Sequence, residues 1–278
     1  AALGGAFVEM PEDPAGLFYN PSSVATLAES RIAATYLKHA LDINSGFLSY
    51  NSTLEGLGDN GSFAVGINYI NYGSFDRADR NGNILGTFGG YDLAAVAAYS
   101  NMLDSNLYYG VALNFITNSL ESSSSSAVAL DAGLLYRMPE ARTNIGLSIL
   151  HVGSQLSTIG GVSEQLPLDI RVGLNHRLRG LPLLLNVSFH HLADETDTFW
   201  KKFENFSLGG ELYISSALRI RLGYDNQRRA GLAPESQKKL AGLSAGLGII
   251  IKDINIDYAM SSFGTVGTLH RFSVAASL

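Results

Sequence analysis

The chain has 278 residues, of which 46% are hydrophobic and 16% are charged, and its formal net charge is −6. The mean hydropathy of +0.12 is high for a soluble protein, but no run approaches the roughly 18 apolar residues of a spanning helix, which excludes a helical membrane protein. The absence of cysteine excludes disulfides, thiol nucleophiles and thiolate metal sites, and the dispersed Lys and Arg residues exclude a concentrated nucleic-acid surface.

The first 28 residues follow neither a period of two nor a period of 3.6. Their three prolines, together with three glycines, indicate an irregular, compact segment. Because the segment also carries Phe7, Val8 and Phe18, we expect it to lie as a plug in the lumen of a barrel formed by residues 29–278. A disordered lead segment is the alternative. A signal peptide is absent from the start of this sequence, so we expect it to have been removed if the protein is exported.

The remainder of the chain fits a period of two. The stretch "SFAVGINYINY" places Phe63, Val65 and Ile67 on one face, and Ala64 and Gly66 on the other. Similar runs, separated by turn signals, predict fourteen strands, an even number that is typical of single-chain bacterial barrels. The predicted strands lie near residues 31–38, 45–52, 61–72, 90–100, 106–117, 126–137, 143–152, 167–177, 182–192, 205–215, 218–227, 242–252, 254–261 and 268–278.

The connections alternate between long and short. "GSFDRADRNGNILGTFG" is followed by "NMLDS", "NSLESSSSS" by "MPEA", and "GSQLSTIGGVSEQL" by "LRGL". Outer-membrane barrels have short periplasmic turns and longer external loops, so the alternation predicts such a barrel, with the first long loop re-entering the membrane near Gly90. The connection "TLEGLGD" is the one short-side turn that looks long.

The apolar faces are expected to point outward against lipid, because the other faces carry charges that a dry core would not accept. The alternative is a soluble β-sandwich, whose apolar faces would point inward. The glycine-rich inner face around Gly242, Gly246 and Gly248 predicts either a close packing partner inside or a bend in the wall. The charges that we expect to face the lumen are Asp131, Arg171, Glu211, Arg219, Arg221 and Asp257.

Catalytic and metal-binding patterns are weak. His190 and His191 are adjacent and would face opposite sides of a strand, so they would not chelate one metal together. Ser188 and Asp194 lie nearby, but proximity in sequence is poor evidence for a catalytic triad. The stretch "DRADRNGN" at 76–83 lacks the glycine spacing of a calcium loop. We therefore expect no enzymatic activity, no metal and no cofactor.

Aromatic residues gather in two of the long loops. Trp200 is the only tryptophan and is flanked by Phe199 and Phe203, while Phe75 and Phe88 lie in another long loop. One interpretation is an aromatic girdle at the lipid interface. The other is a set of anchors for a protein partner, since binding hot spots favour such side chains.

The stretch "GGAFVEMPEDPAGLFYNPSSVA" resembles the amino-terminal hatch of FadL-like outer-membrane barrels, in the branch that contains the type IX secretion proteins PorV and PorQ. The matching residues are Gly4, Gly5, Ala6, Asp13, Phe18, Tyr19, Asn20 and Pro21. The stretches "INYINYGSFDRADRNGNILGTF", "ALDAGLLYRMPEARTNIGLSILHVGSQL" and "QLPLDIRVGLNHRLRGLPLLLNVSFHHL" extend the resemblance over nearly the whole chain, toward PorQ. Ser22 replaces a frequent alanine, and the last strand ends in Leu278 instead of an aromatic residue.

The resemblance implies a fourteen-stranded barrel of the bacterial outer membrane, with the amino-terminal segment inside. It also implies a non-enzymatic role in type IX secretion, in which external loops dock other secretion-system proteins of the cell-surface attachment complex. The alternative function is FadL-like transport of hydrophobic small molecules, which predicts an apolar cavity and a bound lipid or detergent. The expected partners are outer-membrane lipid and secretion proteins, with no nucleic acid.

Overall fold

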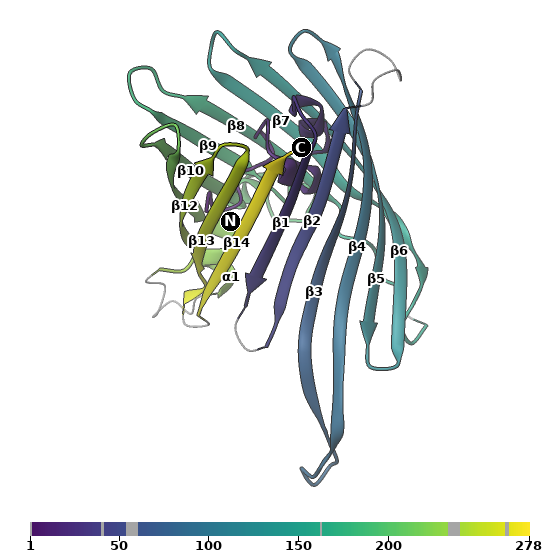
Figure 1. Cartoon of the computed structure of the whole chain (residues 1–278). Coiled ribbons are helices and arrows are strands. Elements are labelled where there is room, and N and C mark those ends of the chain that lie inside the picture. The colour runs from purple at the N-terminus through teal and green to yellow at the C-terminus, as the bar shows by residue number, and fades with distance from the viewer. Residues whose placement is uncertain (1, 40–41, 54–60, 162, 233–239, 265–266) are drawn as a thin grey trace.

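The computed structural model describes residues 2–39, 42–53, 61–161, 163–232, 240–264 and 267–278. Within these residues, fourteen antiparallel strands form one closed barrel (Figure 1). The strands are β1 Arg31–Lys38, β2 Asn44–Thr53, β3 Ser62–Ala78, β4 Ile84–Asp104, β5 Leu107–Leu120, β6 Ser123–Met138, β7 Thr143–Ser157, β8 Asp169–Arg177, β9 Leu183–Phe189, β10 Phe206–Tyr213, β11 Leu218–Asp225, β12 Leu243–Ile251, β13 Ile254–Ser262 and β14 Thr268–Ser277.

The barrel closes between its first and last strands. Each strand pairs with its neighbour in the chain, and β1 pairs with β14 from Arg31 opposite Ser277 to Lys38 opposite His270. Closure gives the strands no free edge along the wall, which a membrane requires because lipid offers no hydrogen-bond partners. The predicted closed fourteen-stranded barrel is confirmed.

The period-two pattern places apolar side chains on the outer surface. On β3, Val65 and Ile67 are exposed, whereas Gly66 between them and the preceding Ala64 are buried. On β14, Phe272 and Val274 are exposed in the same way. Because the outside of the wall is the apolar side, a soluble β-sandwich with an apolar interior is the wrong interpretation.

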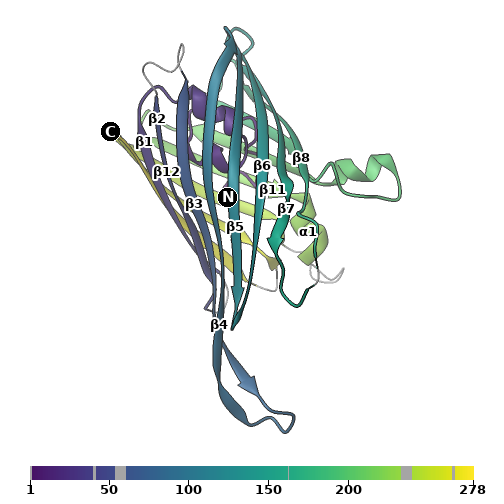
Figure 2. The same cartoon turned by 90° about the vertical axis from the view of Figure 1, so that its right-hand side faces the viewer.

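Two long connections are shorter than predicted, because their strands continue beyond the barrel rim. The pairing of β3 with β4 shifts between Asn71 and Ser74 and then resumes, with Phe75 opposite Phe88. Residues 74–89 therefore form a two-stranded hairpin, the β3–β4 ribbon, instead of a loop that re-enters the wall near Gly90. Figure 2 shows it extending below the other strands. Similarly, β5 ends at Leu120 and β6 begins at Ser123, so most of "NSLESSSSS" is strand.

The barrel has two unlike ends. At the short-turn end, turns of a few residues join β4 to β5, β6 to β7, β8 to β9, β10 to β11 and β12 to β13. The opposite, long-loop end carries the β3–β4 ribbon, the 158–168 connection, the 190–205 loop and the short helix α1, Asn226–Leu232. The alternation of long and short connections therefore holds for several pairs of strands, but not for β5 and β6, which are joined by only two residues at the long-loop end. Most of "TLEGLGD" and of the segment after α1 lies outside the described residues.

Residues 2–27, which we call the plug, lie inside the ring of strands (Figures 1 and 2). The plug contains two short 3-10 helices, η1 Pro14–Phe18 and η2 Pro21–Thr26, each with a proline at its start. A third, η3 Phe199–Glu204, lies in the 190–205 loop. Among the described residues, none of the helices has the length and apolar character needed to cross a bilayer. The division into a plug domain and a barrel domain at residue 28 stays a prediction.

Candidate functional site

The plug packs against a row of glycines on the inner wall, which we call the glycine belt. At each of these positions the space that a Cβ would need is already taken by plug atoms; at Gly110, for example, it would lie 2.5 Å from the backbone of Pro21 and Ser22. At Gly146 a Cβ would lie 2.7 Å from the carbonyl carbon of Val8. The belt consists of Gly66, Gly110, Gly133, Gly146, Gly173, Gly209, Gly223 and Gly246.

The belt explains why the inner faces are rich in glycine. Its members lie on β3, β5, β6, β7, β8, β10, β11 and β12, so the plug follows the wall around most of the barrel. Gly246 faces Ala2 of the plug, which is the close packing partner expected for this stretch. Gly248 instead faces the side chains of Arg221 and Asp257, and Gly242 has a φ of 85° at a turn.

The start of the hatch motif requires glycine for two reasons. Gly4 and Gly5 have φ values of 67° and 105°, in the region that side chains disfavour. A Cβ on Gly4 would also lie 2.6 Å from the carbonyl oxygen of Tyr224. The Ser207 hydroxyl donates to the carbonyl of Gly4 at 2.9 Å, which fixes this turn against β10.

Asn20 holds two parts of the plug to each other and to the wall. It is fully buried, and its amide donates to the carbonyls of Val8 at 2.8 Å and of Leu134 at 3.1 Å. Its side-chain oxygen accepts from the backbone N–H of Ser22 and, at 2.6 Å, from the Ser22 hydroxyl. Pro21 follows at the first position of η2, where its missing N–H costs nothing.

The other hatch residues have structural contacts of their own. Asp13 caps η1 by accepting from the backbone N–H of Ala15 at 2.9 Å. The ring of Phe18 lies 4.9 Å from that of Phe47 on β2, and the ring of Tyr19 lies 5.0 Å from that of Phe7. Together these contacts hold the plug in one conformation rather than as a disordered lead.

Glu9 was not predicted from the sequence, and it is the most deeply buried carboxyl of the plug. Its side chain is fully buried, and the Ser188 hydroxyl donates to Oε2 at 2.6 Å. The other oxygen, Oε1, has no hydrogen-bond partner among the described residues. Burial raises the pKa of Glu9 from 4.5 to about 7, and the Ser188 hydrogen bond opposes the rise. The docked plug therefore favours a protonated Glu9.

The raised pKa of Glu9 predicts that docking of the plug weakens with pH. Between pH 4.5 and about 7 the docked state retains a proton that the released state gives up. Stability should therefore fall over this window, by roughly 3 kcal/mol at most, and level off above it. The denaturant midpoint of the wild type measured across this range should fall, whereas a Glu9→Gln variant should lack this component. An equal change of the denaturant midpoint with pH in the wild type and in Glu9→Gln would contradict the prediction.

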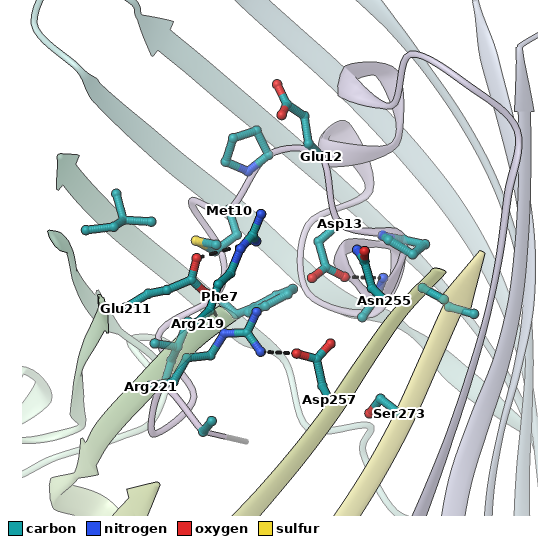
Figure 3. Close-up of a pocket in the computed structure, with 18 of the residues that line it drawn as sticks. Phe7, Met10, Glu12, Asp13, Glu211, Arg219, Arg221, Asn255, Asp257 and Ser273 are labelled. Atoms are coloured by element: carbon teal, nitrogen blue, oxygen red, sulfur yellow. Dashed lines mark hydrogen bonds and ion pairs between the residues drawn. The ribbon is translucent and has the colours of Figure 1, made fainter. Parts of the chain in front are cut away.

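Four of the predicted lumen charges form one network (Figure 3). Arg221 donates from Nε to Glu211 and from a terminal nitrogen to Asp257. Arg219 lies 3.5 Å from the second oxygen of Glu211 and stacks over the ring of Tyr213, with 5.1 Å between Cζ and the ring centre. Burying these charges is tolerable because each faces an opposite charge. The network lies on β10, β11 and β13, on the inner face.

The other two predicted lumen charges lie elsewhere on the inner wall. Asp131 accepts from the Asn114 amide at 2.8 Å and from the backbone N–H of His151 at 2.7 Å. Arg171 donates to Asp169 at 2.7 Å, and its guanidinium lies 5.7 Å from the ring centre of Tyr19 in the plug. Each charge thus has a polar or charged partner.

A cavity of about 750 Å³ lies between the plug and the wall, on the side of the short-turn end. Figure 3 shows Phe7 and Met10 of the plug beside Glu211 and Arg219 of the network, with Asp13 of the plug nearer Asn255. Cationic side chains and carboxylates both line it, together with Asn255 and Ser273. Apolar side chains such as Phe47 and Leu184 also contribute, so the lining is mixed. The charged network distinguishes this cavity from the continuous apolar tunnel expected of a carrier for hydrophobic molecules.

The prediction that His190 and His191 face opposite sides is wrong. Strand β9 ends at Phe189, and His191 has a φ of 55°, so the two rings lie 5.3 Å apart. The backbone N–H of His191 donates to Asp169 at 2.7 Å. Across the described ranges, no three His, Asp or Glu side chains gather in a way that could hold a metal ion.

The stretch at 76–83 forms the tip of the β3–β4 ribbon and is tied together by its own residues. One oxygen of Asp79 accepts from the backbone N–H groups of Asn81 at 2.8 Å and Asn83 at 2.9 Å. The other accepts from the side-chain amide of Asn83 at 2.8 Å. These bonds build a solvated turn around Asp79.

The structure separates the predicted partner-binding aromatics into two places. Phe75 and Phe88 face each other across the β3–β4 ribbon, with ring centres 5.4 Å apart. Phe199, Trp200 and Phe203 contact one another on η3. This helix lies between β9 and β10, which are separated from β3 and β4 by several strands in either direction around the barrel. They therefore do not form one continuous surface.

No protein-family model and no curated protein sequence matches this chain. Solved structures similar to it include the toluene transporter TbuX of Ralstonia pickettii, at 14% identity and a TM-score of 0.66, covering 100% of this chain and 97% of that chain. The toluene transporter TodX of Pseudomonas putida is similar at 13% identity and a TM-score of 0.67, covering 99% and 96%. At these identities the likeness shows the fold. It does not decide between the functions that the resemblance of the sequence implies.

Proposed function

We propose that this protein is a plugged barrel of the bacterial outer membrane that docks partner proteins at its long-loop end, as a non-enzymatic component of type IX secretion similar to PorQ. The observation that carries the proposal is the filled lumen. The plug is seated against the glycine belt, and the cavity beside it is lined by the Glu211, Arg221 and Asp257 network. A lumen of this kind suits a scaffold better than a route for apolar solutes.

The β3–β4 ribbon is the docking element that we propose. An isolated two-stranded hairpin is marginally stable in water, so a ribbon that leaves the barrel gains from a partner. Phe75 is 41% exposed, and Ile84 and Leu85 are 65% and 66% exposed near the tip. Aromatic and aliphatic side chains on a protruding element are typical anchors for a protein partner.

Transport of hydrophobic small molecules is the second candidate. The comparisons favour it over docking, because the similar solved structures are described as toluene transporters. The plug and its contacts would then regulate a route through the lumen. The charged network in the lining of the 750 Å³ cavity is the observation that speaks against this candidate.

Affinity purification from the native outer membrane in mild detergent tests the docking proposal. We expect the tagged wild type to recover partner proteins that a Phe75→Ala, Phe88→Ala variant loses. The matched control is Asp76→Ala, Thr87→Ala, because this pair is adjacent in the same ribbon and faces the opposite side. Recovery of the barrel without partners in all three cases, together with a bound hydrophobic molecule, would overturn docking and favour transport.

A further inference from the structure

The 190–205 loop leaves the barrel wall in an unusual direction. It follows β9 and carries η3, and Figure 2 shows this green arm projecting sideways from the wall rather than along the barrel axis. A loop that extends sideways from a membrane barrel lies over the surrounding lipid. Its aromatic side chains therefore face a different environment from those of the β3–β4 ribbon.

The aromatic residues of this loop continue the lipid-facing surface of the wall. Phe189 is the last residue of β9, and its parity with the exposed Leu185 places it on the outer face. The ring of Phe203 packs edge-on against that of Phe189, with centres 5.5 Å apart. Phe199 and Trp200 contact Phe203 in turn. These four aromatic side chains thus form a continuous series of contacts that extends the apolar outer wall into the loop.

The wall beside this loop is short. Strand β9 has seven residues, and β10 and β11 have eight each. A tilted strand needs about 9–11 residues to cross the hydrocarbon layer. Side chains above these strands must therefore supply the missing apolar surface. Phe199 and Trp200, which are 65% and 77% exposed, lie in the loop that joins β9 to β10.

Two lysines complete the amphipathic character of η3. The ammonium of Lys202 donates to the carbonyl of Leu192 at 3.0 Å, which ties the helix to the start of the loop. Lys201 pairs with the exposed Asp197. Cationic side chains next to aromatic rings are favoured at the level of the lipid headgroups, where anionic groups meet the hydrocarbon boundary.

We propose that Phe199, Trp200 and Phe203 form a lipid anchor, which inserts at the headgroup boundary beside the short strands β9 to β11. The partner of this surface is the bilayer and not a protein. The proposal depends on the barrel spanning a membrane, and it is independent of docking through the β3–β4 ribbon.

The fluorescence of Trp200, the single tryptophan of the chain, tests the proposal directly. The intact protein is reconstituted into phosphatidylcholine and phosphatidylglycerol vesicles, with or without bromine on the acyl chains. We expect blue-shifted emission from Trp200 and strong quenching by brominated lipid. Quenching by aqueous iodide should be severalfold weaker than for a tryptophan in the solvated ribbon. Two single-tryptophan references set the scale: Trp200→Phe with Val172→Trp reports the lipid-facing wall, and Trp200→Phe with Phe88→Trp reports the solvated ribbon.

Red-shifted emission that iodide quenches as strongly as in the ribbon reference would overturn the lipid anchor. In that case the η3 aromatics would be free for a protein partner. The lipid-facing reference shows in the same experiment whether the barrel is inserted, so a failure of reconstitution cannot be mistaken for exposure of Trp200.

Discussion

Replacing Gly223 by valine is expected to force the start of the plug away from the wall and to open the lumen. The new side chain would overlap the backbone of Leu3 and Gly4, which cannot move aside as a flexible side chain could. Overpacking of this kind costs about 1–3 kcal/mol or more. In planar lipid bilayers the variant should show channel openings that the wild type lacks.

Gly210→Val is the matched control for this variant. Gly210 lies on β10 beside the belt glycine Gly209 but on the outer face, where a Cβ would meet only side-chain atoms of Leu183 and Leu185 at 3.8 and 4.0 Å. The control should remain closed. Openings of equal size in both variants, or in neither, would show that the glycine belt does not seat the plug.

Replacing Arg221 by methionine is expected to destabilise the barrel strongly. Arg221 is the common partner of Glu211 and Asp257, and the Glu211 side chain is only 2% exposed. Removing the central charge leaves a buried carboxylate without its main partner, at a cost of about 3–5 kcal/mol. We expect the lower end of this range, because Asp257 is 32% exposed and water can solvate it. The denaturant midpoint followed by circular dichroism measures the loss.

A triple variant separates the loss of the ion pairs from the loss of packing. Glu211→Gln and Asp257→Asn added to Arg221→Met remove three of the four network charges while keeping similar volumes. The remaining charge, Arg219, is 31% exposed and can be solvated by water, so most of the stability should return. If the triple variant is as unstable as Arg221→Met alone, the cost lies in packing and the electrostatic account is wrong.

The strand pattern could be predicted because each transmembrane strand shows its environment directly in the sequence. Lipid selects apolar side chains at every second position, as at Val65 and Ile67, and turn residues separate the strands. The ends of β1 and β13 were predicted almost to the residue for this reason. The β3–β4 ribbon was missed because its outer part lies beyond the lipid, where Ser74, Asp76 and Arg77 follow no apolar alternation.

The site was predictable only where the sequence carries a local signal. Gly4, Gly5 and Asn20 stand in a motif, and the structure places all three in contacts that hold the plug. Glu9 gave no signal, because its partner Ser188 lies 179 residues away and only the closed barrel brings them together. His191 was misplaced because nothing in the sequence shows that β9 ends at Phe189 and that the backbone then adopts a positive φ.

The central claim is that the seated plug closes the lumen to apolar solutes. The most direct test measures the uptake of radiolabelled toluene by cells whose outer membrane is the barrier to its entry. It compares a deletion strain with strains that express the wild type or Gly223→Val at equal levels. We predict equal uptake with the wild type and with the deletion, and faster uptake only with Gly223→Val. Faster uptake with the wild type than with the deletion would contradict a closed lumen and establish transport.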